Sequence, residues 1–246
     1  MRIALISDIH ANREAFEACL EHARRSGADE YVFLGDYVGY GADPGWVVDA
    51  VMAHVEQGAI AVVGNHDAAA IGKPAGMNED AAIAIAWTRT KLTPKQSEFL
   101  GRLPLTAQRG GYLYVHADPV APADWGYITD LYSASRALVA TQAHATFCGH
   151  THVPSLFHMS VTGKFAGFDP IDRVEIPLTA RRRWLAVIGS VGQPRDHNPA
   201  ACYALLDDTQ EVLTYIRVPY DVDTAAKKIR NAGLPIGLSY RLYQGY

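Results

Sequence analysis

Polar side chains that can bind metals or move protons recur where short apolar runs of the sequence end. The apolar runs 3–6, 31–34 and 59–63 are each followed within a few residues by such a group, and further along the chain single or paired histidines do the same. Carboxylates, imidazoles and one amide, without thiolates, suit divalent Mn, Fe, Zn or Co. The candidate residues are Asp8, His10, Asp36, Asn65, His66, His116, His150 and His152.

The spacing of these residues favours two ions over one. Asp8 and His10 are two positions apart in what reads as an extended segment, so both side chains are expected to point the same way, as are His150 and His152. Asp36 follows a strand between these pairs and could join two ions through its two oxygens. Two ions about 3.5–4 Å apart can clamp a phosphoryl group and convert a water between them into hydroxide.

The stretch 64–67 adds catalytic candidates. A glycine allows a sharp turn after the apolar run, and Asn65 then offers a carbonyl oxygen and His66 an imidazole. Asp67 is expected to orient His66 and to favour its protonated form near neutral pH, which would suit a general acid. The alternative for Asp67 is a cap on the following turn, and two nearby cations would oppose protonation of His66.

The elements that position these residues alternate between strand and helix. Residues 12–25 are expected to form a helix capped by Asn12, and Pro44 to start another that covers Val47, Val48 and Val51. With the strands 3–6, 31–34 and 59–63, this order predicts right-handed crossovers and a parallel sheet. Ligands of such sheets bind beyond the carboxyl ends of the strands.

The second half of the chain is predicted to be rich in strands. Residues 68–82 read as a mobile connection, residues 120–127 as a loop, and no element is predicted after Pro235. One domain over 1–246, with two packed sheets, is the simplest interpretation. The further strands expected are 113–115, 145–148, 156–161, 173–177, 184–188, 202–206 and 212–218, and the further helices 83–91, 94–103, 130–143 and 221–231.

Composition narrows the class of protein. Of the 246 residues, 49% are hydrophobic and 20% charged, and the net charge of −4 gives no reason to expect stable nucleic-acid binding. Cys19, Cys148 and Cys202 show no zinc or redox spacing and suit a reducing cytoplasm. No signal peptide and no membrane-spanning stretch are predicted, so the protein is expected to be cytoplasmic.

Five motifs together resemble the calcineurin-like metallophosphoesterase family. They are Asp8-Ile9-His10, Gly35-Asp36, Gly64-Asn65-His66-Asp67, His116 and Gly149-His150-Thr151-His152, in the family order. The resemblance implies an α/β fold, a four-layer α/β/β/α sandwich of two mixed β-sheets flanked by helices. It also implies that one metal is held by Asp8, His10, Asp36 and His152, and the second by Asp36, Asn65, His116 and His150. Asn65 and His66 would face the substrate phosphate.

The stretch 189–195 resembles small prokaryotic members of this family, akin to its cyclic-phosphodiesterase and diadenosine-polyphosphate-hydrolase branches. Arg195 is a candidate phosphate contact, because a guanidinium matches phosphate oxygens in a fork; the alternative is a salt bridge to Asp196 or to a surface acid. Where the family often has a small glycine-serine step, this chain has Ala117-Asp118-Pro119, so the loop on the substrate side is expected to differ.

The resemblance implies a dinuclear metal phosphoesterase that hydrolyses phosphodiester or nucleotide substrates through attack by a metal-bridging hydroxide. The alternatives are a phosphomonoesterase or protein phosphatase, and a non-catalytic binding scaffold of the same fold. A phosphate-ester small molecule or nucleotide is the expected partner, and an oligomer is possible. Aromatic residues in or near the loops could form a base-stacking rim or pack the loops against the sheet: Tyr37, Tyr40, Trp46, Trp125 and Tyr127.

Overall fold

A computed structural model describes residues 1–73 and 76–246 and contains two mixed six-stranded sheets. The first sheet has the order β3-β2-β1-β11-β12-β9, in which β1, β2 and β3 are parallel and the other pairs antiparallel. Its strands are β1 (Arg2–Ile6), β2 (Glu30–Phe33), β3 (Ile60–Ala61), β9 (Glu175–Pro177), β11 (Ala201–Asp207) and β12 (Val212–Val218).

The second sheet has the order β4-β5-β6-β10-β7-β8, with β5, β6 and β10 parallel. It places the strand before His116 next to the strand before His150, so their carboxyl ends meet at one edge. Its strands are β4 (Thr106–Arg109), β5 (Tyr112–Val115), β6 (Ala145–Cys148), β7 (Ser155–Ser160), β8 (Phe165–Phe168) and β10 (Arg182–Val187).

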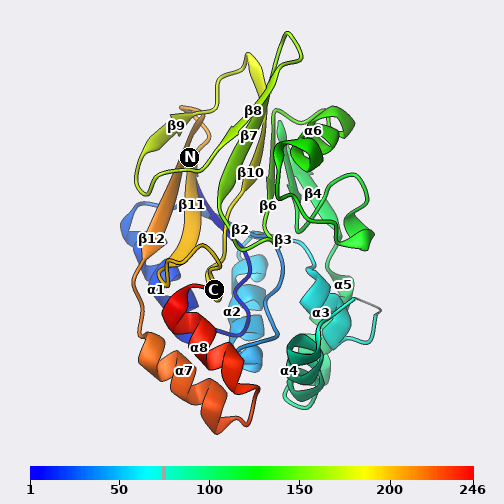
Figure 1. The fold of residues 1–246 in the computed structure, drawn as a ribbon, viewed down its shortest axis with the longest axis vertical. Helices are drawn as coiled ribbons and strands as arrows, with labels where there is room; N and C mark the ends of the chain where they lie inside the picture. Colours follow the sequence, from blue (N-terminus) through cyan, green and yellow to red (C-terminus); the bar gives the residue numbers. More distant parts are fainter. Residues whose placement is uncertain (74–75) are drawn as a thin grey trace.

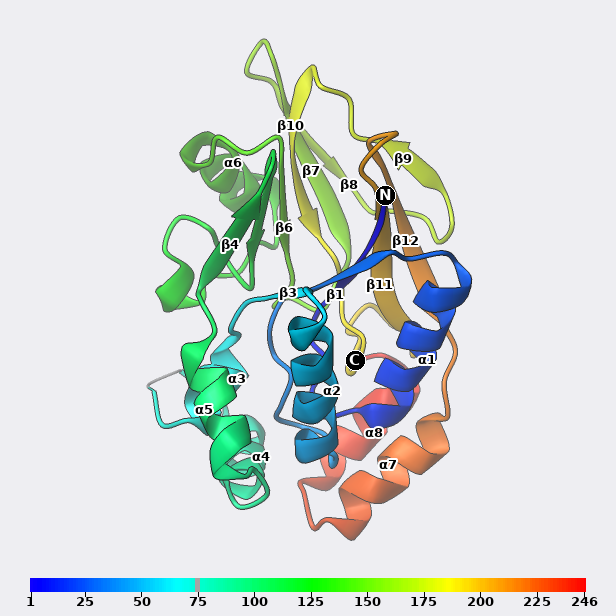
Figure 2. The same cartoon turned by 180° about the vertical axis from the view of Figure 1, so that it is seen from behind.

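Helices cover the outer faces of both sheets. Helices α1 (Arg13–Arg25) and α2 (Pro44–Glu56) pack Phe16 and Val48 against the first sheet, in front of it in Figure 2. Helix α6 (Leu131–Ala140) packs Leu138 against the second sheet (Figure 1). Buried side chains of both sheets, including Leu5 and Trp184, form the core between them. The expected four-layer α/β/β/α sandwich is therefore confirmed.

The remaining helices gather beside the strand ends that carry the candidate residues. They are α3 (Asn65–Ala70), α4 (Glu79–Arg89), α5 (Pro94–Arg102), α7 (Val222–Asn231) and α8 (Ile236–Gln244), with a short 3₁₀ turn at Pro122–Asp124. Helices α7 and α8 form a hairpin (Figure 1). Its apolar residues share a small core with α4 and Tyr40. Within the described ranges, every helix is too short or too polar to cross a lipid bilayer.

Some expected elements differ from the structure. The prediction of a mobile connection over 68–82 is wrong at both ends, because α3 continues to Ala70 and Asn78 caps α4; residues 74–75 lie outside the described residues. Strands β4 and β8 and helix α8 were not predicted. The helix capped by Asn12 is confirmed, since its side chain accepts a hydrogen bond from the Ala15 N–H at 3.2 Å.

Candidate metal centre

The loops after the parallel strands bring the predicted ligands together in two groups that share Asp36. In each group the candidate ligand atoms lie within 4.8 Å of one another. All of these residues are buried, with at most 6% of their surface exposed. The first ligand group consists of Asp8, His10, Asp36 and His152, and the second of Asp36, His116 and His150.

The first ligand group has two imidazole nitrogens facing each other. The Nε2 atoms of His10 and His152 are 3.1 Å apart, and His152 Nε2 lies 3.2 Å from Asp8 Oδ1. Each ring has its other nitrogen, Nδ1, against a backbone carbonyl, that of Val38 for His10 at 3.1 Å and that of Gln193 for His152 at 2.6 Å. A proton on Nδ1 is therefore donated to the carbonyl, and Nε2 keeps its lone pair.

This arrangement fits a cation. Burial is the largest influence on both rings and lowers the pKa of His10 and of His152, so both imidazoles are neutral near pH 7. Two lone pairs 3.1 Å apart repel each other unless a positive ion lies between them and the carboxylates. The donor set of two carboxylates and two imidazoles is one that borderline divalent ions accept.

The second ligand group is built in the same way. His116 Nδ1 donates to the Leu34 carbonyl at 2.8 Å, and its Nε2 lies 3.4 Å from Asp36 Oδ2. His150 Nε2 donates to the Trp125 carbonyl at 2.9 Å, which leaves Nδ1 as its ligand atom. The Oδ1 atom of Asn65 is 3.2 Å from His116 Nε2, so the predicted amide ligand is also in place.

Asp36 lies between the two groups. Its Oδ2 is 3.6 Å from His10 Nε2 and 3.4 Å from His116 Nε2, while its Oδ1 accepts the His66 backbone N–H at 2.8 Å. Although burial opposes it, the Asp36 carboxylate raises the pKa of His116 to about 9 in the metal-free protein. One imidazolium is thus the cation at this carboxylate until a metal replaces its proton.

The ligands are not on extended backbone, and the premise that paired them by alternation is wrong. Asp8, His10, Asp36, His150 and His152 have φ angles of 54°, 49°, 55°, 70° and 62°, all in the left-handed region. For residues other than glycine, this conformation costs on the order of 1–3 kcal/mol each and clusters at functional sites. The left-handed turns bring both members of each pair to the same centre.

Two glycines of the motifs are required by close packing against the ligands. A Cβ on Gly64 would meet the Asp36 carboxylate, and one on Gly149 would meet Ser7 Oγ and the Asp8 carboxylate. Only glycine fits at these two positions, because the ligand carboxylates occupy the space that a Cβ would need. Any larger residue at either position would displace a ligand of the centre.

The Asp67 carboxylate binds backbone N–H groups and does not orient His66. The expectation that it orients His66 is therefore wrong. The Oδ1 atom of Asp67 accepts the N–H groups of Tyr37 and Val38, at 2.9 and 3.2 Å, and its Oδ2 those of Asp36 and Gly64, at 2.8 and 3.0 Å. It therefore caps α3, as the alternative expectation had it, and fixes the loop that carries Asp36.

His66 is buried beside both ligand groups. Its ring packs edge-on against His10, with centroids 4.8 Å apart, and lies 4.5 Å from the Tyr40 ring. Its Nδ1 has no hydrogen-bond partner among the described residues. Burial lowers the pKa of His66 to about 4, so the imidazole is neutral and not the protonated form that was expected.

Arg195 lies at the side of the first ligand group. Its guanidinium donates to Gln193 Oε1 at 3.0 Å and lies 5.6 Å from the centre of the Tyr40 ring, and its backbone N–H bonds to the His152 carbonyl. The alternative expectation, a salt bridge to Asp196 or to a surface acid, is wrong, because Asp196 pairs with Arg217 and Arg195 forms no salt bridge with the described residues.

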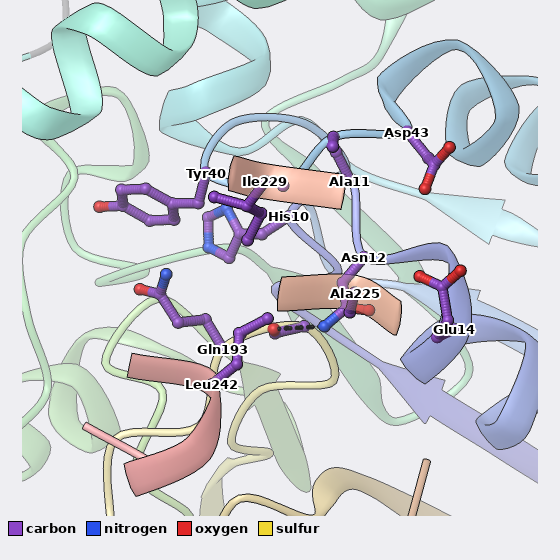
Figure 3. Close-up of a pocket in the computed structure, with 13 residues that line it drawn as sticks. His10, Ala11, Asn12, Glu14, Tyr40, Asp43, Gln193, Ala225, Ile229 and Leu242 are labelled. Carbon is purple, nitrogen blue, oxygen red and sulfur yellow. Dashed lines mark hydrogen bonds between the residues drawn. The ribbon is translucent and has the colours of Figure 1, made fainter. Parts of the chain in front are cut away.

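Sequence reasoning missed several groups that shape the centre. Carbonyls of Leu34, Val38, Trp125 and Gln193 orient the four histidines, and nothing in a side-chain pattern reveals a carbonyl. Figure 3 shows Gln193 beside Tyr40 and His10, at a cavity of about 10 Å³ that the helical hairpin also lines. The repeated glycines in 189–192 were the available signal for backbone packed at the ligands.

Comparison with known proteins agrees with this geometry. The model of the calcineurin-like phosphoesterase superfamily domain matches residues 1–211. The chain is 34% identical to an uncharacterized protein of Methanocaldococcus jannaschii, over 99% of this chain and 98% of that protein. A crystal structure of a metallophosphoesterase from Sphaerobacter thermophilus is 36% identical and superimposes with a TM-score of 0.88, covering 100% of this chain and 99% of that one.

A hypothetical protein of Pyrococcus horikoshii has the same fold, with 21% identity, a TM-score of 0.77 and coverage of 100% of this chain and 98% of that chain. The fold, the two ligand groups that share a carboxylate and the family match point to one conclusion. The chain belongs to the calcineurin-like phosphoesterase superfamily.

Proposed function

We propose that the protein is a dinuclear metal-dependent phosphoesterase. The observation that carries this proposal is the pair of buried ligand groups that share Asp36, whose Oδ2 lies 3.6 Å from His10 Nε2 in the first group and 3.4 Å from His116 Nε2 in the second. One ion would be held by Asp8, His10, Asp36 and His152, and the other by Asp36, Asn65, His116 and His150.

When bound, two such ions polarise phosphoryl oxygens and make water a nucleophile at neutral pH. The chain's own residues do the rest. His66 is close enough to both ligand groups to hydrogen-bond a phosphate or leaving-group oxygen, and the Arg195 guanidinium can steady a second oxygen. Asp67 contributes by holding the Asp36 loop, which is a positioning role.

Phosphodiesters or nucleotides are the substrates we favour. The support is the stretch 189–195, which resembles small prokaryotic members akin to the cyclic-phosphodiesterase and diadenosine-polyphosphate-hydrolase branches. Its Arg195 guanidinium, which matches phosphate oxygens in a fork, lies beside the first ligand group. A phosphomonoesterase or protein phosphatase uses the same centre, and relative rates on bis-p-nitrophenyl phosphate and p-nitrophenyl phosphate separate these activities. Cyclic nucleotides and diadenosine polyphosphates extend the comparison to natural diester and anhydride bonds.

The test begins with metal analysis of protein loaded with Mn, Fe, Zn or Co. Two ions per chain and hydrolysis of at least one of these substrates are expected. Replacement Asp36→Asn should lower the affinity for both ions by about 10–100-fold or more. Loss of a group that only orients a metal ligand has an effect of this size, and loss of the ligand itself should cost at least as much. Asp124→Asn, at an exposed site in the 3₁₀ turn, is the control.

Retention of two ions in Asp36→Asn would reject the shared ligand. Two ions without turnover of any substrate would favour the non-catalytic scaffold.

The three cysteines are buried and unpaired, which supports a proposed cytoplasmic location, where thiols stay reduced.

A further inference from the structure

Burial separates the five aromatic residues that were expected either to form a base-stacking rim or to pack loops. Tyr37 and Tyr40 are buried, and the Tyr37 hydroxyl donates to the Val62 carbonyl at 2.6 Å. Trp46 packs edge-on against Phe16. Tyr127, in contrast, exposes 56% of its surface. Three of the five therefore pack, and Tyr127 has a free ring face.

Tyr127 is stacked on a residue of the second ligand group. The centroids of the Tyr127 and His150 rings are 4.1 Å apart, and the planes differ by 19°. One face of the tyrosine is therefore against a candidate metal ligand, and exposure leaves the other for a molecule bound at the centre. Trp125, two residues earlier, brings its ring centroid to 6.0 Å from that of His116.

The loop that carries these rings is fixed in place. The Trp125 carbonyl accepts the proton of His150 Nε2, and the Asp118 N–H bonds to the Gly126 carbonyl at 3.0 Å. Trp125 itself is in the left-handed region, at φ 55°. A ring held in position before binding loses little conformational freedom when a ligand stacks on it, so more of the contact energy appears as affinity.

The Tyr40 side of the centre is tightly packed. Tyr40 packs against His10 and His66, with centroids 4.6 and 4.5 Å away, and the Arg195 guanidinium lies over it. The cavity beyond, shown in Figure 3, measures about 10 Å³ and is lined by Ile229 and Leu242 of the helical hairpin. Such a volume holds about one water molecule. An organic group attached to phosphate does not fit there, whereas the exposed ring of Tyr127 is accessible to it.

We propose that the exposed face of Tyr127 is the platform on which a nucleobase of the substrate stacks while its phosphate lies at the two ligand groups. This assignment rests on the proposed phosphoesterase function and narrows the substrate class to nucleotides and their esters. Stacking on an aromatic ring tolerates any base, so the platform selects for a base without selecting its sequence or identity.

The test compares two ligands that differ only in the base. Adenosine 5′-monophosphate and ribose 5-phosphate are titrated into the Mn-loaded protein by calorimetry. The wild type should bind the nucleotide about tenfold more tightly, the size expected for one base stacked on an aromatic ring. Tyr127→Leu should remove this preference and leave the affinity for ribose 5-phosphate unchanged, whereas Tyr127→Phe should retain it.

Tyr132→Leu is the matched control, because Tyr132 is 73% exposed on α6 and should leave the preference intact. Equal affinity of the wild type for both ligands, or no measurable affinity for either, overturns the platform. An equal loss for both ligands with a lower Mn content in Tyr127→Leu also overturns it, because the tyrosine then only supports His150. Hydrolysis of the substrates is measured separately. If the protein hydrolyses none of them but still shows a base preference that depends on Tyr127, the proposed function is rejected and the platform is retained.

Discussion

The buried imidazole of His66 has a low pKa, and its Nδ1 has no hydrogen-bond partner in the described part of the chain; these two properties decide how it can act on a phosphate ester. A group with a pKa of about 4 is neutral near pH 7, and two bound cations would lower that pKa further. A neutral imidazole is a weak acid but a competent hydrogen-bond donor. We therefore expect His66 to stabilise the phosphoryl group in the transition state and not to protonate the leaving oxygen.

Replacement His66→Ala should keep both metals and lower kcat by about 10²–10³-fold, as loss of one preorganised donor does. The loss should be equal for p-nitrophenyl esters, whose leaving group needs no proton, and for alkyl esters, whose leaving group needs one, because His66 does not supply that proton. Steady-state kinetics with both ester types, together with metal analysis, make the check. A loss confined to alkyl esters would instead show that His66 acts as the general acid.

Arg195 makes the second prediction at the scale of single residues. Its guanidinium is half-buried and already hydrogen-bonded to Gln193 Oε1, so it is held near the first ligand group. Removing a charge-assisted bond to phosphate from such a site should raise KM by about tenfold, the lower end for charged hydrogen bonds. Arg195→Ala is measured on each accepted substrate beside Arg182→Ala, whose guanidinium covers Trp184 on the second sheet. Unchanged kinetics would give Arg195 a structural role.

At the scale of elements, the loops that carry the ligands could be located from the sequence, but their conformation could not. An apolar run that ends in Asp8 or His150 reveals where a strand stops, since strands of α/β sheets end at the site. The left-handed φ of both residues depends on contacts made by distant segments, such as the bond from the His150 N–H to Asp8 at 3.0 Å. Local patterns do not contain such contacts.

The missed elements have a similar cause. Helix α8 buries only a narrow face, with Leu238 and Leu242 packed near Ile229 of α7, so its apolar period is short and weak. Helix α4 was predicted from residue 83, and only its start at Glu79 differs, where the Asn78 side chain caps it. For α8, packing against other helices supplies what the local pattern lacks.

Gly39 provides a prediction about the loop between β2 and α2. Its φ is +87°, and a Cβ there would meet the His66 ring. Gly39→Ala should displace that ring and lower kcat by about tenfold or more, because catalysis is sensitive to small misplacements. Gly58 has a φ of +102°, and a Cβ there would have no atom of the described residues within 4 Å, so Gly58→Ala imposes backbone strain alone.

Gly58→Ala should therefore lose about 1 kcal/mol of stability and keep full activity. Chemical denaturation and kinetics of the two variants are compared side by side. If both variants lose stability equally and neither loses activity, the position of the His66 ring does not matter for catalysis.

At the scale of the whole molecule, the metal centre lies where the two sheets meet. Asp8, His10 and Asp36 follow strands of the first sheet, whereas His116, His150 and His152 follow strands of the second. Each ligand group takes residues from both. Two bound ions would therefore link the two sheets at this edge and add to the stability that the core between the sheets provides.

Metal removal should therefore lower the melting temperature, and by an amount that depends on pH. Each ion present at about 100 times its Kd adds about 2.7 kcal/mol. For a chain of this size, each such contribution corresponds to a rise of about 5–10 °C. His116 sets the pH dependence, because its pKa is about 9 in the folded metal-free protein and near ~6.5 in the unfolded chain.

Protonated His116 stabilises the metal-free protein fully below about pH 6.5, and this contribution is lost as the pH rises through about 9. A metal that binds to the second ligand group must displace the same proton, so its affinity increases over that range. Both effects have the same sign for the difference between loaded and metal-free protein. Melting temperatures with and without Mn should differ more at pH 8.5 than at pH 6.5, and His116→Ala should abolish the dependence. A difference that is constant or larger at pH 6.5 would mean that His116 does not exchange its proton for a metal.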